Sequence, residues 1–307
     1  MEDLFLDKLK NIIESDRVKL KEPMSKHTTL HIGGEADYLV YPSSIQEIKD
    51  ILLLCKDSNI PYYIMGNGSN LLVSDSGYRG LIIKLGNQFA DIEVKEEGLV
   101  IAQAGVLMSK LSSVIAEHEL TGFEFGAGIP GTLGGAVTMN AGAYGGEIKD
   151  CILSATVIDT EGKICTLDKT ALQLEYRSSI IQKQNLCLLE AKMKFYKGEK
   201  QKILDKIHEL NSLRRDKQPL EKYSAGSTFK RPEGYFAGKL ISDAGLKGFQ
   251  IGGAAVSDKH CGFLINKDNA SAKDFIKLIG EVIRIVEAKY GVRLEPEVKF
   301  LGTFDMD

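Results

Sequence analysis

The stretch Gly126-Ala127-Gly128-Ile129-Pro130-Gly131-Thr132-Leu133-Gly134-Gly135 decides which kind of fold the chain can adopt. Gly126, Gly128 and Gly131 match the spacing G-x-G-x-x-G, which in dinucleotide-binding folds joins a strand to a helix. Here Pro130 stands where that helix would begin, and more glycines follow, so the stretch disfavours a Rossmann unit. This much glycine costs conformational entropy, and it predicts a backbone that closely approaches a flat or charged group. A purely structural loop is the alternative.

A shorter glycine-rich loop, Gly66-Asn67-Gly68-Ser69-Asn70, follows the apolar segment 62–65. Its two glycines let the backbone turn sharply and point several N–H groups at one spot, which suits phosphate. Ser69 and Asn70 add side-chain donors. An ordinary tight turn is the alternative for this loop taken alone. Together the two loops predict a site for a large, phosphate-bearing cofactor.

Composition and charge restrict the class of protein. The 307 residues are 43% hydrophobic and 26% charged with a net charge of −3, which predicts two or three soluble domains. Mixed charge gives no basic surface for nucleic acid, and no apolar run is long enough to cross a membrane. The acidic, amphipathic start is unlike a signal peptide, and the five scattered cysteines suit a reducing compartment. We expect a cytoplasmic protein without a metal site, since the histidines are scattered as well.

The periodicity of apolar residues predicts a mixture of helices and strands. Helices are expected over 3–13, 44–55, 108–118, 200–214, 235–244 and 271–290. Strands are expected over 37–41, 62–65, 81–85, 186–195, 254–256 and 262–265, and hairpins over 92–104 and 155–167. Capping boxes are predicted at Ser44 with Glu47 and at Ser271 with Asp274, and Gly291 suits the end of the last helix. The order indicates an α/β lobe up to about residue 86, followed by a section richer in strands.

Three short segments, far apart in the sequence, carry groups suited to reduction chemistry. Ser224–Lys230 predicts a small-residue turn that presents the hydroxyl of Ser227 beside a cation, Lys230. Arg177 offers a fixed positive charge and Glu297 a carboxylate. A hydroxyl acid, an anion clamp and a bound cofactor suggest reduction of an activated double bond. Taken singly, each residue is equally well explained as a turn, surface or strand-end residue.

Six strings then stand in a familiar order: Gly66–Asn70, Gly128–Thr132, Asn140–Gly145, Tyr176-Arg177, Gly226–Lys230 and Leu294–Val298. In this order they resemble the UDP-N-acetylenolpyruvoylglucosamine reductases (the MurB family), flavoproteins of bacterial peptidoglycan precursor synthesis. The similarity runs from about residue 20 to 303. The stretch between Arg177 and Ser227 is short, which resembles the compact type that lacks an extra tyrosine-bearing substrate loop.

The resemblance implies an α+β fold with a two-lobed FAD-binding region of the vanillyl-alcohol-oxidase (PCMH-like) kind and a C-terminal α+β substrate domain. The lobes are expected over 1–86 and 87–205 and the substrate domain over 206–303, with the tail 299–307 a candidate to pack back on the first lobe. It implies an NADP-linked UDP-N-acetylmuramate dehydrogenase for cell wall biogenesis, cell shape and cell division. This enzyme uses non-covalently bound FAD and NADPH as hydride donor to reduce UDP-N-acetylglucosamine enolpyruvate to UDP-N-acetylmuramate. The expected partner is therefore a UDP-sugar, and the expected state is a monomer.

Family roles fall on matching positions of this chain. Ser227 is expected to protonate the substrate, Arg177 to clamp its carboxylate, and Glu297 to orient Arg177 or to donate through a protonated carboxyl. Lys217, Lys230 and Arg231 are expected to bind substrate, although many members have Asn where this chain has Arg231. FAD binding is expected at Tyr63, Gly66, Asn67, Gly68, Ser69, Asn70, Leu71, Gly128, Ile129, Pro130, Gly131, Thr132, Gly134, Gly135, Asn140, Gly142, Ala143 and Tyr144.

Two other functions are compatible with the same cofactor site. One is a different flavoenzyme of this cofactor-binding class, such as an oxidase that passes electrons to oxygen. The other is a sugar-nucleotide sensor that keeps the FAD scaffold without catalysis. Neither requires Ser227, Arg177 and Glu297 together, and all three are present.

Overall fold

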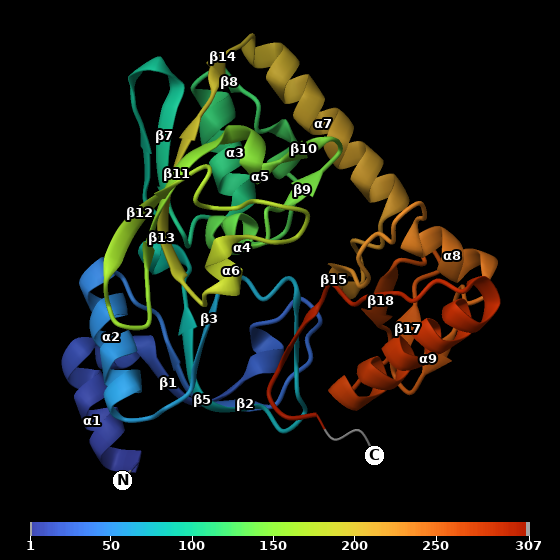
Figure 1. Ribbon diagram of the computed structural model, residues 1–307, viewed down its shortest axis with the longest axis horizontal. Coiled ribbons are helices and arrows are strands. Elements are labelled where there is room, and N and C mark those ends of the chain that lie inside the picture. Colours follow the sequence, from blue (N-terminus) through green and yellow to red (C-terminus); the bar gives the residue numbers. More distant parts are fainter. Residues whose placement is uncertain (1, 305–307) are drawn as a thin grey trace. The chain divides into compact units, whose positions relative to one another are not determined.

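The computed structural model describes residues 2–304, so residues 305–307 of the predicted tail lie outside the described residues. The chain forms two compact units, each assembled from segments far apart in the sequence (Figure 1). Unit 1 runs up to Leu20 and includes Tyr38–Asn67 and Gly80–Leu213. Unit 2 comprises Lys21–Asp37, Gly68–Arg79 and the chain from Arg214 onward. The predicted domain boundaries after residues 86 and 205 stay predictions.

A five-stranded antiparallel sheet forms the centre of unit 1, in the order β12-β11-β13-β7-β6. Its strands are β6 (Ile92–Val94), β7 (Leu99–Gln103), β11 (Ile152–Ile158), β12 (Ile164–Asp168) and β13 (Cys187–Lys194). They confirm both predicted hairpins and the predicted strand over 186–195. Four helices lie between these strands in the sequence: α3 (Met108–Glu117), α4 (Leu133–Thr138), α5 (Ile148–Cys151) and α6 (Ile180–Lys183). Phe89, Phe123 and Phe195 are the largest fully buried side chains of its core.

A second sheet has the order β1-β2-β5-β3, with β3 parallel to β5. Its strands are β1 (Val18–Pro23), β2 (Glu35–Val40), β3 (Tyr62–Met65) and β5 (Tyr78–Lys84), and α1 (Glu2–Ile12) contacts α2 (Ile45–Asp57). Ser44 caps α2 as predicted, because its hydroxyl accepts from the N–H of Glu47. The Glu47 carboxylate, however, accepts from the N–H of Ser43 and binds Arg17, because the carboxylate is drawn to a neighbouring guanidinium.

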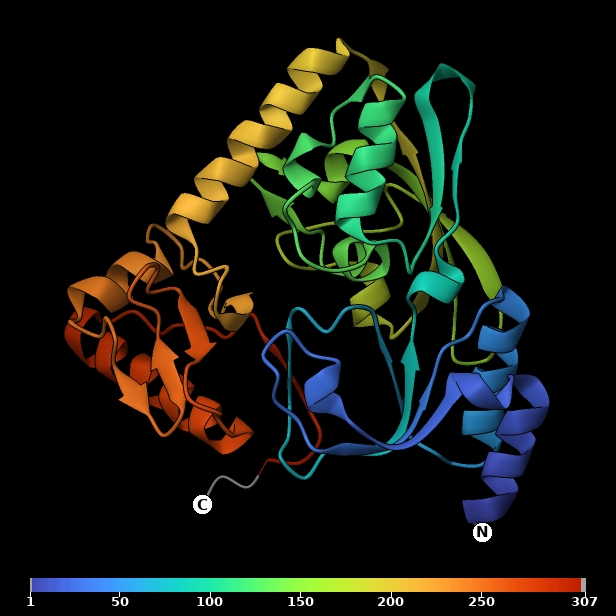
Figure 2. The ribbon, with the colours of Figure 1, turned by 180° about the vertical axis from the view of Figure 1, so that it is seen from behind.

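Unit 2 is built on an antiparallel sheet in the order β15-β18-β17-β16, packed on the long helix α9 (Figure 2). The elements are β15 (Tyr223–Ser227), α8 (Ala237–Asp243), β16 (Gln250–Ile251), β17 (Ala254–Val256), β18 (Phe263–Asn266) and α9 (Ala272–Tyr290). The predicted capping box of Ser271 with Asp274 is present, and Gly291 ends α9 in the left-handed conformation with φ 66°. Strand β19 (Lys299–Leu301) runs parallel to β4 (Leu71–Val73).

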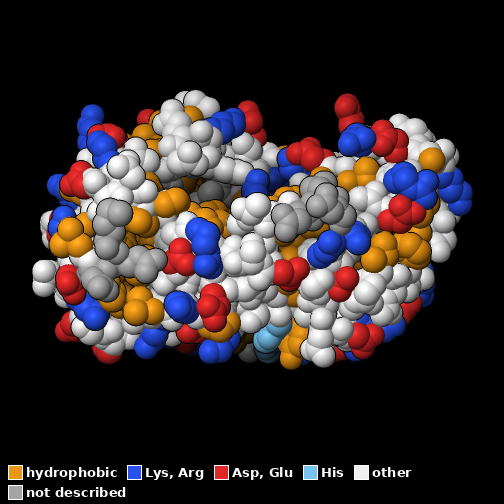
Figure 3. All heavy atoms as spheres, turned by 90° about the horizontal axis from the view of Figure 1, so that it is seen from below, with side chains coloured by type: hydrophobic (Ala, Val, Ile, Leu, Met, Phe, Trp, Pro, Cys, Tyr) orange, Lys and Arg blue, Asp and Glu red, His pale blue; other side chains and the backbone are white. Residues whose placement is uncertain are grey.

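The helix α7 (Lys200–Lys217) is longer than the predicted 200–214, and it buries Ile203 and Leu210 one above the other. The remaining short strands are β8 (Leu120–Thr121), β9 (Gly142–Ala143), β10 (Gly146–Glu147) and β14 (Tyr196–Lys197). None of the helices in the described part of the chain is long and apolar enough to cross a membrane. Positive and negative side chains are interspersed on the face drawn in Figure 3.

Candidate active site

Ser227 lies at the end of an edge strand, where the sequence predicted a turn. Tyr223 and Ser224 pair with β18, and Ser227 pairs with Phe263 after a shift of register, so β15 contains a β-bulge. Gly226 within the bulge has φ 76° and nothing within 4 Å of the position that a β-carbon would take. The bulge re-aims the chain at this point and leaves Ser227 exposed beside open space.

Glu297 comes from a segment that pairs with the residues immediately after β15. Its N–H donates to the carbonyl of Thr228 at 2.8 Å, and the N–H of Lys230 donates to the carbonyl of Glu295 at 2.9 Å. Phe229 and Pro296 form the antiparallel bridge between these two bonds. Unit 2 thus brings Ser227 and Glu297 together on neighbouring segments. The ammonium of Lys230, the cation predicted beside Ser227, pairs with the exposed carboxylate of Glu295.

The second half of the shorter glycine loop lies in the same unit. The side-chain amide of Asn70 donates to the carbonyl of Glu297 at 3.2 Å, and the N–H of Lys299 donates to the carbonyl of Asn70 at 3.0 Å. Gly68 is buried, with φ 63° in the left-handed region. The loop is therefore joined directly to the segment that carries Glu297.

The first half of that loop meets the longer glycine loop within unit 1. A β-carbon on Gly66 would lie only 2.0 Å from the hydroxyl oxygen of Thr132, so only glycine allows the two loops to touch. Gly135 faces open space, since the nearest atom to its missing side chain is 4.0 Å away. The backbone of α4 can therefore be approached closely there, which fits a flat cofactor. Tyr63 precedes the loop, and burial raises the pKa of its hydroxyl.

Arg177 stands in a tight turn of unit 1, bridged by Glu175 and Ser178, with φ 56°. Its Nη2 donates to the carbonyl of Gly142 at 3.4 Å, and its guanidinium lies 5.0 Å from the centroid of the Tyr176 ring. Unit 1 thus brings Arg177 next to the 140–144 segment that was predicted to bind the cofactor. Cation–π contact and the carbonyl together orient the guanidinium.

Asn140 is fully buried, and its amide bonds to other parts of the protein. Its Nδ2 donates to the Glu147 carboxylate at 2.6 Å and to the carbonyl of Glu175 at 3.1 Å, and its Oδ1 accepts from the N–H of Lys149 at 2.9 Å. The bond to Glu175 links Asn140 to the turn that carries Arg177. The structure therefore shows its side chain as a support of this turn.

The predicted substrate-binding residues lie in unit 2 in two places. Lys217 is exposed at the end of α7, where Lys259 donates to the carbonyl of Arg215 at 2.6 Å. The guanidinium of Arg231 lies 4.0 Å from the centroid of the Phe236 ring, and its Nε donates to the carbonyl of Tyr235 at 3.3 Å. Nothing in the sequence singled out Glu295 and Lys259. Only the fold shows that Glu295 contacts Lys230 and that Lys259 binds the end of α7 next to Lys217.

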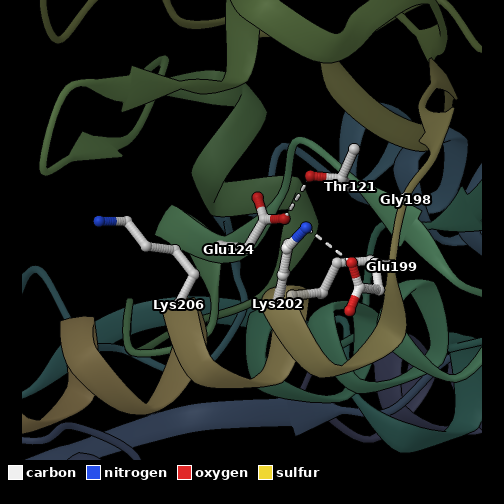
Figure 4. Close-up of a pocket in the computed structure, with 7 residues that line it drawn as sticks. Thr121, Glu124, Gly198, Glu199, Lys202 and Lys206 are labelled. Carbon is white, nitrogen blue, oxygen red and sulfur yellow. Dashed lines mark hydrogen bonds and ion pairs between the residues drawn. The ribbon is translucent and has the colours of Figure 1, made fainter.

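A separate hollow in unit 1, of about 350 Å³, contains none of the predicted site residues (Figure 4). It is lined by Thr121, Glu124, Gly198, Glu199, Lys202, Ile203 and Lys206. Within it, Lys202 pairs with Glu199 at 2.7 Å and the Thr121 hydroxyl donates to Glu124 at 2.6 Å. Lys206 pairs with Glu209, outside the hollow, at 2.9 Å. Because each charged group that lines the hollow already has a protein partner, we do not assign it a ligand.

The cysteines give no sign of redox or metal chemistry. All five are free thiols, and four of them are buried. Burial raises the pKa of Cys55, Cys151 and Cys187 to about 12, so these thiols stay protonated at neutral pH. The fifth, Cys165, is exposed on β12, although the sequence alone favours core positions for most of them. Over residues 2–304 no group of three His, Cys, Asp or Glu side chains is arranged to hold a metal.

Comparison with known proteins identifies two regions of the chain. Residues 36–168 match the FAD binding domain, and residues 218–301 match the C-terminal domain of UDP-N-acetylenolpyruvoylglucosamine reductase. The reductase of Lachnoclostridium phytofermentans is 54% identical to this chain over 305 residues, which cover 98% of each chain. The reductase of Caldanaerobacter subterraneus is 47% identical over 302 residues, which cover 98% of this chain and 99% of the relative.

Solved structures agree. The crystal structure of the Thermus caldophilus reductase matches with a TM-score of 0.80 and 33% identity, over 93% of this chain and 99% of its own. An alkyldihydroxyacetonephosphate synthase matches with a TM-score of 0.50 and 18% identity, over 63% of this chain and 40% of its own, and shows the shared fold alone.

The chain is therefore an FAD-binding oxidoreductase of α+β fold, with a PCMH-like cofactor domain followed by a substrate domain. It belongs to the UDP-N-acetylenolpyruvoylglucosamine reductase family, and its activity is the reductase step of peptidoglycan precursor synthesis. These matches confirm the predicted family, fold class and type of enzyme.

Proposed function

We propose that this enzyme uses NADPH and non-covalently bound FAD to reduce UDP-N-acetylglucosamine enolpyruvate, with Ser227 as proton donor and Arg177 and Glu297 as its catalytic partners. The observation that carries the proposal is the arrangement in unit 2. There the bulge with Ser227 is hydrogen-bonded to the Glu297 segment, which is bonded in turn to the glycine loop through Asn70.

The glycine loops fit FAD and are proposed to hold it through backbone N–H groups and small side chains. Bound FAD supplies hydride transfer from NADPH to the substrate. The contact of Gly66 with Thr132 fixes one loop against the other, and the open space at Gly135 admits a flat group. The two loops contain no cysteine or histidine, which supports non-covalent attachment.

Ser227 is proposed to give its proton to the carbon next to the one that accepts hydride. A serine hydroxyl is a weak acid, so it requires a nearby cation or a proton relay. Lys230 and Lys217 are the candidates for that cation. Lys230 follows Ser227 closely, and its ammonium pairs with the exposed carboxylate of Glu295.

Arg177 and Glu297 are proposed to stabilise the substrate carboxylate as negative charge develops on it. The planar fork of Arg177 suits a carboxylate, and its charge does not vary with pH. Glu297 is fixed at its backbone by bonds to Thr228 and Asn70, so its carboxyl group extends from a defined point. Preorganised groups of this kind lower a barrier because they do not have to reorient during the reaction.

We also propose the compact family type and a monomeric, cytoplasmic enzyme. Ordered elements fill the sequence between Arg177 and Ser227, namely α6, β13, β14 and α7, which supports the lack of a long substrate loop. The cysteines form no disulfide, which suits a reducing compartment. Lys217, Lys230 and Arg231 are proposed to face the diphosphate or carboxylate of the UDP-sugar.

The test is an anaerobic experiment on the two half-reactions. NADPH should bleach the visible absorbance of the yellow protein, and the enolpyruvyl substrate should restore it. In Ser227→Ala the bleaching should persist and recovery should stall, whereas Ser113→Ala, a surface hydroxyl of α3, should behave as wild type. Full turnover of Ser227→Ala would remove the serine from its role. Rapid recovery in air alone would favour an oxidase, and UDP-sugar binding without NADPH consumption would favour a sensor.

A further inference from the structure

Thr29, a residue outside every motif of the sequence, makes two hydrogen bonds that connect the glycine loop to the strand of Ser227. Its N–H donates to the carbonyl of Gly68 at 3.3 Å. Its hydroxyl donates to the carbonyl of Ser224 at 2.7 Å. All of these residues belong to unit 2. One residue therefore contacts both the predicted cofactor loop and the strand of the predicted proton donor.

The bond to Ser224 acts on the exposed edge of a sheet. Strand β15 is the edge strand of the order β15-β18-β17-β16, so its outward carbonyls have no neighbouring strand to bind. Thr29 satisfies the carbonyl of Ser224, and Glu297 satisfies that of Thr228. These two bonds flank the β-bulge on both sides. The position of Ser227 between them is thus fixed from outside the sheet.

The loop that carries Thr29 is itself firmly docked on the same sheet. The side-chain amide of Asn266 in β18 donates to the carbonyl of Leu30 at 3.0 Å. The rings of His31 and Tyr223 stack with centroids 3.9 Å apart. Thr28 closes the loop by bonds between its hydroxyl and Ile32. Because other residues hold the loop together, the hydroxyl of Thr29 is not needed for the fold of the loop.

We infer that Thr29 is a positioning residue, which sets the place of the Ser227 hydroxyl relative to the flavin-binding loop. This inference rests on the proposed roles of Ser227 and of the glycine loop. Its effect should appear in the proton-transfer half-reaction, where a misplacement of about 1 Å costs on the order of a hundredfold in rate. Reduction of the flavin by NADPH does not use Ser227 and should not change.

The decisive comparison is Thr29→Val, which keeps the shape and the backbone N–H and removes only the hydroxyl. We expect bleaching by NADPH within about twofold of wild type, and reoxidation by the enolpyruvyl substrate slowed by about ten- to a hundredfold. Thr29→Ser keeps the hydroxyl and should restore reoxidation. Thr156→Val, which removes a half-buried threonine hydroxyl on β11 in unit 1, is the matched control and should leave both half-reactions unchanged.

If Thr29→Val does not retain flavin, the pair Thr29→Ser and Thr29→Ala replaces it, because these two differ only in the hydroxyl. Reoxidation equal in members of the pair, or equal in Thr29→Val and wild type, would overturn the inference. An equal loss in both half-reactions would do so too, since it would mean that Thr29 only supports the cofactor loop. Failure of the proposed function is seen separately, as wild-type protein that does not regain its absorbance with the substrate.

Discussion

Replacing Asn140 by Ala should destabilise unit 1 strongly, although the residue resembles a cofactor ligand in the sequence. The side chain is fully buried and makes two bonds to backbone groups and one to the Glu147 carboxylate. Neutral hydrogen bonds of this kind contribute about 1 kcal/mol each and a bond to a charged group about 1.5–3 kcal/mol. The three together contribute about 4 kcal/mol to the free energy of unfolding.

The backbone adds a second, smaller cost. Asn140 has φ 45°, in the left-handed region that Asn tolerates better than Ala, and this difference costs about 1 kcal/mol. Asn59 has φ 51° in an exposed turn, so Asn59→Ala carries the backbone cost without the buried network. At about 2–4 °C per kcal/mol, we expect Tm to fall by about 10–20 °C in Asn140→Ala and by about 2–4 °C in Asn59→Ala.

The assay is thermal unfolding followed by circular dichroism on flavin-free protein, so that any loss of cofactor does not contribute. Asn140→Asp should be at least as unstable as the alanine variant at neutral pH, because it places a carboxylate against that of Glu147. If Asn140→Ala melted within a few degrees of Asn59→Ala, the network would not be the main role of the residue. Loss of flavin without loss of stability would instead support the predicted role of Asn140 in cofactor binding.

Further predictions concern the loops, the clamp and pH. Gly66→Ala should lose most of its bound FAD, because the new β-carbon would overlap Thr132 of the longer glycine loop. The ratio of visible to ultraviolet absorbance measures the FAD that stays bound. Gly280→Ala, which adds a β-carbon into open space beside α9, should keep its FAD. Arg177→Lys should be bleached normally by NADPH but should be reoxidised by the substrate at least about tenfold more slowly than wild type. The reason is that the lysine ammonium cannot bind a carboxylate through two parallel hydrogen bonds as the arginine guanidinium does. Reoxidation at the wild-type rate would contradict this prediction. A hydrogen bond from Arg17 lowers the pKa of the Glu47 carboxyl group in the folded protein below its ordinary value of 4.5. The ionised carboxylate therefore stabilises the folded state fully above pH 4.5, and this stabilisation is lost as the pH falls through the lowered pKa. The Tm difference between wild type and Glu47→Gln should therefore shrink below pH 4.5, and a constant difference would contradict the role of this carboxylate.

Elements governed by neighbouring residues were predictable from the sequence. The helix α9 is the clearest case, because Ser271, Asp274 and Gly291 supply both of its ends and its apolar residues share one face. The hairpins β6–β7 and β11–β12 likewise follow from alternating residues on either side of a turn. At Ser44 the local cap formed as predicted, but a distant guanidinium decided where the Glu47 carboxylate points.

Features that depend on distant partners were not predictable in this way. Ser224–Ser227 is made of small residues with little strand propensity, yet it forms the end of β15 because β18 pairs with one edge. The division of the shorter glycine loop between the two units has no local signature either. Asn140 illustrates a third case, in which an Asn within a glycine-rich string is equally suited to bind a ligand or the chain itself.

The bulge of β15 explains why the chemistry of Ser227 is compatible with an ordinary turn sequence. A bulge next to a left-handed glycine changes the direction of the strand, and Ser227 directly follows that glycine while still pairing with Phe263. Such a bulge at a sheet edge is free to slide unless its outer carbonyls are bound. Thr29 and Glu297 bind them at either side, and both are attached to the glycine loop, through Gly68 and Asn70. The acid and the cofactor loop are thus placed by the same small set of bonds, so a change in either bond should alter proton transfer before it alters folding.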